Sequence, residues 1–127
     1  MRTIAVIQAR MGSSRFPGKV MKEVAGRPLI EILLRRLVVC RYIDKLVLAT
    51  SESCENEPLV RFVENLGFEV YRGSEIDVLD RYYQVAIAYQ ADTVVRITGD
   101  CPIIDPTIVD AVIERYEEDG ADYACNV

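Results

Sequence analysis

The chain has 127 residues, of which half are apolar and 28% are charged, and its net charge is −5 at pH 7. This length fits one domain with a core of its own. The acidic balance argues against general nucleic-acid binding, and no apolar stretch is long enough to span a membrane. Histidine is absent, which excludes a histidine base, a histidine metal ligand and the usual hydrolase triads.

The cysteines and the N-terminus indicate the compartment. Cysteines stand at positions 40, 54, 101 and 125 without any C-x-x-C spacing, and the N-terminus has no signal-peptide pattern. We therefore expect reduced thiols in a cytoplasmic protein. Because the chain has no histidine, any chemistry should rest on carboxylates, cations and a hard metal ion.

A polar stretch follows the first predicted strand. The apolar run at residues 4–7 predicts that strand, and residues 8–19 (QARMGSSRFPGK) come directly after it. Glycine lets the backbone approach a ligand closely, and clustered backbone N–H groups bind anions. The three cations of the stretch, Arg10, Arg15 and Lys19, would neutralise phosphates. Because open α/β sheets place ligands just after such a strand, we interpret the stretch as a triphosphate-binding loop. A solvated loop of the same composition is the alternative.

The loop matches neither of two common phosphate-binding motifs. Gly12 and Gly18 are one residue too far apart for a Walker A loop, and Val20 replaces its hydroxyl residue. The dinucleotide pattern G-x-G-x-x-G is also absent. The sequence therefore predicts neither a P-loop NTPase nor a dinucleotide-binding loop.

Apolar periodicity predicts helices and strands in alternation along the rest of the chain. The alternation indicates one α/β domain, residues 1–127, with a mostly parallel sheet and helices on both faces in three layers. Helices are expected from Pro28, from Pro58 to Gly67, from Asp77, and from Asp105 to Gly120. Further strands are expected at residues 46–49, 68–71, 93–97 and 122–127.

The helix from Asp77 has an apolar pattern that includes an aromatic pair. We expect this pair to belong to the core and not to stack on a nucleotide base. The residues predicted to share the buried face are Leu79, Tyr82, Tyr83, Ala86 and Ile87.

The strand at residues 93–97 leads to Asp100. In a doubly wound sheet of strand order 3-2-1-4, the ligand crevice opens between strands 1 and 4 at their carboxyl ends. The loop after the first strand and Asp100 are therefore expected to meet. A carboxylate beside a triphosphate is explained by Mg²⁺, which bridges carboxylate and phosphate oxygens. A simple turn-capping role for Asp100 is the alternative.

Three motifs, QARMGSSRFPGKVM, RGSEIDVLDRYY and VVRITGDCPIIDP, resemble the cytidylyltransferase family of the spore-coat polysaccharide biosynthesis protein F type. CMP-Kdo synthetases and acylneuraminate cytidylyltransferases look like more distant relatives. The resemblance implies the nucleotide-diphospho-sugar transferase fold, which is Rossmann-like. It also implies transfer of CMP from CTP to an acidic sugar, with Mg²⁺ and release of pyrophosphate, in surface polysaccharide biosynthesis.

The resemblance also implies site residues, carried over one by one. The family's metal-binding aspartate falls on Asp100, and residues 72–74 match a region near the nucleotide base. The residues expected to carry catalysis are Arg10, Arg15, Lys19 and Asp100. The residues expected to bind the nucleotide are Gln8, Ala9, Arg10, Gly12, Ser13, Ser14, Arg15, Lys19, Arg72, Gly73 and Ser74.

One departure from the family concerns length. Family members are considerably longer, and their later half supplies a further metal carboxylate, much of the sugar pocket and the usual dimer contact. The chain is therefore expected to be a fragment or a reduced relative. Its last predicted strand would leave an open sheet edge, so we expect a homo-oligomer, a dimer.

Two other functions stay open. One is a sugar-1-phosphate nucleotidyltransferase that uses UTP or GTP, although such enzymes usually carry G-x-G-T-R in this loop. The other is a nucleotide-binding or assembly module without catalysis.

Overall fold

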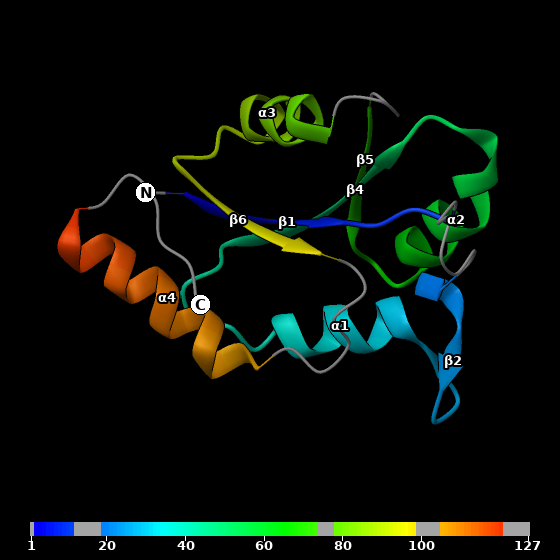
Figure 1. Cartoon of the computed structure of the whole chain (residues 1–127), viewed down its shortest axis with the longest axis horizontal. Helices are drawn as coiled ribbons and strands as arrows, with labels where there is room; N and C mark the ends of the chain where they lie inside the picture. Colours follow the sequence, from blue (N-terminus) through cyan, green and yellow to red (C-terminus); the bar gives the residue numbers. More distant parts are fainter. Residues whose placement is uncertain (1, 12–18, 74–77, 99–104, 121–127) are drawn as a thin grey trace.

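A parallel four-stranded sheet forms the centre of the molecule. The structure is a computed structural model that describes residues 2–11, 19–73, 78–98 and 105–120. The strands lie in the order β5-β4-β1-β6 (Figure 1). This arrangement confirms the predicted α/β class, the parallel sheet and the strand order 3-2-1-4. The strands are β1 (Thr3–Gln8), β4 (Lys45–Ser51), β5 (Glu69–Gly73) and β6 (Thr93–Thr98).

Helices cover both faces of this sheet, but unequally. The helices are α1 (Leu29–Leu37), α2 (Glu57–Asn65), α3 (Val78–Ala88) and α4 (Pro106–Asp119). Figure 1 shows α3 on one face of the sheet and α1 and α4 on the other. Side chains of α2 share a buried cluster with those of α1 and α4, so these three helices cover one face together. The predicted three layers are therefore present.

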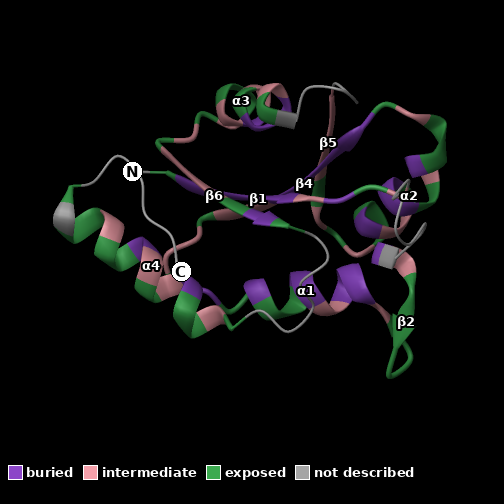
Figure 2. Ribbon diagram, viewed as in Figure 1, coloured by how far each residue is buried: buried purple, intermediate pink, exposed green. Residues whose placement is uncertain are grey.

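The alternation of side chains along β1 divides the core in two. Figure 2 shows that β1 is buried along most of its length. Ile7 packs toward α1 and α2, together with Leu34 and Leu59. Val6 points to the opposite face and packs with Val85 of α3. All five side chains are fully buried, and each contributes about 1.5–3 kcal/mol through its removal from water.

A small hairpin precedes α1, and the sequence analysis did not predict it. Its strands, β2 (Glu23–Val24) and β3 (Arg27–Pro28), pair antiparallel. Ala25 and Gly26 form the turn with φ of +54° and +83°, as expected for a two-residue turn with two left-handed positions. Pro28 is therefore the last residue before α1, with an extended ψ of 146°, and not its first helical residue.

The predicted buried face of α3 is wrong. Leu79, Tyr83 and Ile87 are 71%, 60% and 55% exposed, whereas Tyr82 is buried. The helix has two apolar stripes, and Arg81, which is 2% exposed, lies with the inward one. Apolar periodicity does not distinguish the two stripes, and an arginine is normally a sign of exposure. The prediction therefore placed residues of the outer stripe in the core.

The predicted helix ends agree better with the structure. Gly67 has a φ of +93° and follows Leu66, the C-cap of α2, as predicted for a glycine that ends a helix. Asp105 caps α4 by accepting a hydrogen bond from the Thr107 N–H at 2.9 Å, and Gly120 is left-handed. Asp77 and the strand predicted at residues 122–127 lie outside the described residues. None of the described helices is long and apolar enough to cross a membrane.

The two described cysteines differ in their surroundings, which gives a first prediction. Cys40 is buried and Cys54 is exposed, and both are free thiols. Burial, assisted by the nearby Asp110 carboxylate, raises the pKa of the Cys40 thiol to about 11. Since the thiolate is the reactive form, we expect iodoacetamide at pH 8 to alkylate Cys54 and to spare Cys40.

Peptide mapping by mass spectrometry after native labelling measures both sites. Labelling in urea is the control, because unfolding should expose Cys40 and make the two thiols react alike. Equal labelling of Cys40 and Cys54 in the native protein would contradict the described packing around Cys40.

Candidate functional site

The carboxyl ends of β1 and β6 lie next to each other. Gln8 is in register with Thr98, so the chain leaves both strands at the same edge of the sheet. The cationic loop follows β1 and the segment with Asp100 follows β6. The strand order therefore supplies the adjacency on which the predicted site depends. Residues 12–18 and 99–104 themselves lie outside the described part of the chain.

The described site residues surround the start of this edge. Gln8 accepts a hydrogen bond from the Tyr82 hydroxyl at 3.3 Å. Ala9 is buried, and its N–H donates to the Ala49 carbonyl at 3.2 Å, which continues the pairing beyond β1. Arg10 is exposed. The predicted residues outside the described ranges are Gly12, Ser13, Ser14, Arg15, Ser74 and Asp100.

Both ends of the cationic loop are fixed to the core. Met11, at its start, packs against the main apolar cluster. Lys19, at its end, belongs to the short 3-10 helix η1 (Lys19–Met21). Val20 of η1 is 6% exposed and joins the same cluster as α1. The loop is thus held at two points on one side of the sheet.

Arg96 avoids the cost of a buried charge in β6. Its side chain is exposed, because β6 is the last strand of the described sheet, and its guanidinium lies 4.6 Å from the centre of the Tyr82 ring. A cation over an aromatic face is a favourable contact. Tyr82 thus contacts both Arg96, through its ring, and Gln8, through its hydroxyl.

Arg72 is committed to the turn after β4. Its Nε donates to the Ser51 carbonyl at 3.3 Å and a terminal nitrogen donates to the Ser53 carbonyl at 3.0 Å. The other terminal nitrogen pairs with Glu57, and this hydrogen bond and the Arg72 charge lower the pKa of that carboxyl group. Arg72 therefore shapes the rim of the site through residues 51–57.

Gly73 permits a close approach that any larger residue would crowd. A Cβ at this position would stand 3.1 Å from the Arg81 Cγ and 3.1 Å from a ring carbon of Tyr71. The buried Arg81 side chain thus passes directly against the backbone at the end of β5. Sequence reasoning did not select Arg81, although it stands in the motif RGSEIDVLDRYY.

Asn56 is a second residue that sequence reasoning missed. It is the last residue of the short 3-10 helix η2 (Cys54–Asn56) and directly precedes α2, yet its side chain makes no capping bond. The side chain is fully buried and instead joins Met11 to Ser51. Its one sequence signal, an asparagine before a helix, is explained equally well by an ordinary cap.

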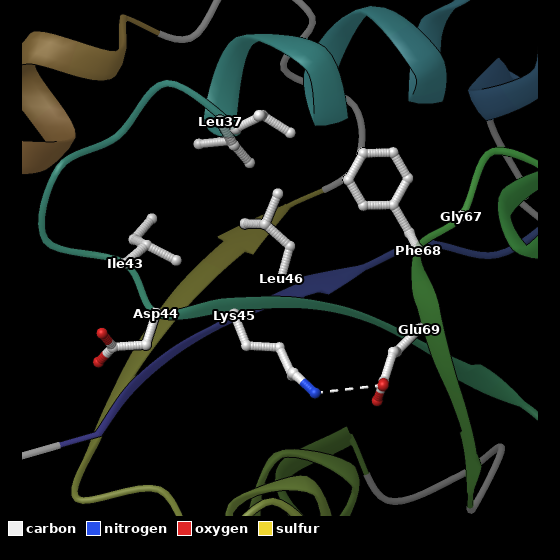
Figure 3. A pocket seen from close by; sticks show the side chains of 9 residues that line it. Leu37, Ile43, Asp44, Lys45, Leu46, Gly67, Phe68 and Glu69 are labelled. Atoms are coloured by element: carbon white, nitrogen blue, oxygen red, sulfur yellow. Dashed lines mark hydrogen bonds and ion pairs between the residues drawn. The ribbon is translucent and has the colours of Figure 1, made fainter.

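An open cavity of about 320 Å³ lies elsewhere, at the amino ends of β4 and β5. Figure 3 shows Leu37, Leu46 and Phe68 around it, with the 3.2 Å ion pair between Lys45 and Glu69 on its rim. Parallel sheets bind ligands at the opposite, carboxyl edge. We therefore assign the candidate site to the carboxyl edge and not to this cavity. The described residues contain no group of three potential metal-ligating side chains.

Similar proteins show the family to which the chain belongs. A sequence model of the family described as cytidylyltransferase matches residues 4–127. The spore coat polysaccharide biosynthesis protein SpsF of Bacillus subtilis is 39% identical over 93% of this chain and 51% of its own length. The 3-deoxy-manno-octulosonate cytidylyltransferase of Syntrophotalea carbinolica is 33% identical over 95% of this chain and 48% of its own length.

Solved structures give the same result. A cytidylyltransferase from Leptospira borgpetersenii superposes with a TM-score of 0.89 at 34% identity, over 94% of this chain and 50% of the other. A CMP:2-keto-3-deoxy-manno-octonic acid synthetase solved with CTP superposes with a TM-score of 0.84 at 27% identity, over 95% and 49%. The chain thus spans about half the length of these relatives. By the family match along nearly its whole length, the chain belongs to the cytidylyltransferase family.

Proposed function

We propose that this chain binds CTP at the carboxyl edge of its sheet and takes part in the transfer of CMP to a sugar. A sugar oxygen would attack the α-phosphorus of CTP, which forms the CMP–sugar bond and releases pyrophosphate. The observation that carries the proposal is the register between Gln8 and Thr98, since it directs the cationic loop and the segment with Asp100 to one edge. The similarity to a synthetase solved with CTP supports the choice of nucleotide.

The loop after β1 would hold the phosphates. Arg10, Arg15 and Lys19 carry the positive charge, and backbone N–H groups of Gly12, Ser13 and Ser14 add hydrogen-bond donors. Gln8 and Ala9 would line the start of the loop. Arg72, Gly73 and Ser74 would lie on the base side, where Arg72 fixes the rim. Catalysis would then rest on positioning and on stabilisation of charge at the transferred phosphate.

Asp100 is the proposed metal ligand. A hard divalent cation, Mg²⁺, would bind its carboxylate and neutralise phosphate charge. A fold relative from Mycobacterium tuberculosis was solved in complex with manganese, with a TM-score of 0.65 and 20% identity. That similarity concerns the fold, so the metal at this site stays a proposal.

The acceptor and the setting are inferred from relatives. An acidic sugar as acceptor and a role in surface polysaccharide biosynthesis are supported by the names of the relatives. A cytoplasmic location and a dimeric state are proposed from the sequence patterns alone. A non-catalytic nucleotide-binding module is the second candidate, because the chain spans about half the length of the relatives it matches.

The phosphate assignment predicts a selective loss of triphosphate affinity. Lys19→Ala and Arg15→Ala should each weaken CTP binding about tenfold or more, since each removes a charge-assisted hydrogen bond to phosphate. CMP binding should change much less, because CMP lacks the β- and γ-phosphates. Calorimetric titration of both nucleotides measures the two effects.

Lys45→Ala is the matched control. Lys45 lies at the amino end of β4, at the edge of the sheet opposite the proposed phosphates. This control should bind CTP like the parent. Equal losses for CTP and CMP in the loop variants would refute the phosphate assignment.

The metal assignment predicts a loss of cation dependence. Asp100→Asn is nearly isosteric, so the fold should survive, but the amide lacks the charge that holds Mg²⁺. We expect Mg²⁺ to tighten CTP binding in the parent and to have little effect in the variant. Titrations with and without Mg²⁺ give the comparison, and an unchanged Mg²⁺ effect would reduce Asp100 to a turn residue.

Calorimetric titration and a pyrophosphate-release assay, each with CTP, UTP, GTP and ATP, test the function itself. We expect the 127-residue chain to bind CTP in preference to the other three and to release little pyrophosphate, because the family's further metal carboxylate and much of its sugar pocket lie in the later half. Sedimentation of the same sample should show self-association. A strictly monomeric chain with full turnover would contradict this expectation, and a preference for UTP or GTP would overturn the cytidylyl assignment.

A further inference from the structure

We propose that Asn56 is a positioning residue that fixes the first peptide of the phosphate loop. The inference rests on the proposed function for its ligand, a nucleoside triphosphate. Its structural part, the hold on Met11, stands on contacts of described residues alone. Asn56 would touch neither nucleotide nor metal, and would act through the backbone at Met11.

The Asn56 side chain joins two distant segments. Its Oδ1 accepts a hydrogen bond from the Met11 N–H at 2.8 Å, across 45 positions of the sequence. Its Nδ2 donates to the Ser51 hydroxyl oxygen at 2.7 Å and lies 3.5 Å from the Ser51 carbonyl oxygen. The start of the loop is thereby tied to the end of β4.

An amide suits this position better than the other short polar side chains. The two contacts require one acceptor, toward Met11, and one donor, toward Ser51, on a single planar group. A carboxylate offers no donor and a hydroxyl is too short to reach both. The side chain is 0% exposed, so water cannot replace either partner. Its place before α2 would favour capping, yet it makes no capping bond.

The partner of Asn56 is itself held from a third strand. Arg72 of β5 donates to the Ser51 and Ser53 carbonyls and pairs with Glu57. The Ser51 hydroxyl also accepts a hydrogen bond from the Ser53 N–H at 3.3 Å. The ends of β1, β4 and β5 are therefore joined by one chain of hydrogen bonds, and Asn56 is its link to the loop.

This link fixes the residue at which the proposed phosphate loop begins. Met11 is the last described residue before the stretch with Gly12, Ser13, Ser14 and Arg15. A fixed Met11 peptide would leave fewer backbone conformations to be lost when these residues bind phosphate. Binding is tighter when the bound conformation is prepared in advance. Loss of the Asn56 contact should therefore weaken triphosphate binding without removing any group that touches phosphate.

Amide hydrogen exchange by NMR tests the hold on Met11 in the absence of nucleotide. In Asn56→Ala the Met11 amide should exchange at least about tenfold faster, because its acceptor is gone. Asn56→Asp keeps the acceptor and should restore Met11 protection. Val63→Ala is the matched control, since Val63 is fully buried on α2, and its loss lowers stability without touching this network.

Calorimetry with the same variants tests the consequence for the ligand. Relative to Val63→Ala, Asn56→Ala should raise the Kd for CTP about tenfold, which corresponds to about 1.4 kcal/mol. The Kd for CMP should change by less than about threefold, because the loop serves the β- and γ-phosphates. Ser51→Ala removes the neighbouring hydroxyl but leaves the Met11 contact, so its effect on CTP should be smaller.

Each outcome decides a separate point. Met11 exchange in folded Asn56→Ala no faster than in Val63→Ala overturns the inference, as does an unchanged Kd for CTP. If Asn56→Ala does not fold, the contact is tested in the unaltered protein. The measurement is the NMR coupling across the hydrogen bond, between the Met11 ¹⁵N and the Asn56 side-chain carbonyl ¹³C. Absence of this coupling overturns the inference. If the unaltered protein binds no CTP, the proposed function fails, while exchange and coupling still decide the hold on Met11.

Discussion

The parallel pairing of β1 with two neighbours is the constraint on which the rest of the structure depends. β1 lies between β4 and β6, and both pairings run parallel. All three strands therefore end at one edge of the sheet. Because short hairpins cannot join parallel strands, each connection crosses back to the opposite edge through a helix. The polar groups that follow each strand, around Arg10, Ser51 and Thr98, gather there as a consequence.

The sequence predicts this architecture well, because its signals are local. The alternation of apolar runs identifies the four strands, and single residues such as Gly67 and Asp105 mark helix ends through backbone geometry that they favour themselves. Prediction from the sequence fails where the structure depends on contacts between residues that are distant in the sequence. The inward face of α3 includes Arg81, which is buried next to Gly73, and neither residue signals the other in the sequence. The hairpin at Ala25 was missed because its strands have only two residues each.

The candidate site divides in the same way. Loop residues such as Arg10 and Lys19, and also Asp100, are proposed from the sequence because their types and their place after a strand indicate phosphate and metal chemistry, and these roles stay predictions. Asn56 and the role of Arg72 cannot be proposed in this way, because their partners lie 45 and 15 to 21 positions away. A buried amide is also an ordinary residue type before a helix. Its function is visible only once the sheet has brought Met11 and Ser51 together.

The charge of the loop explains why a neutral side chain makes this contact. Arg10, Arg15 and Lys19 repel one another within one short stretch, so the stretch needs an anchor that does not depend on its cations. A carboxylate at position 56 would also accept the Met11 N–H, but its charge would compete with phosphate for those cations. An amide would hold the backbone and leave the positive charge of the loop for the proposed phosphates. The carboxylate that follows Asn56 in the sequence, Glu57, is itself paired with Arg72.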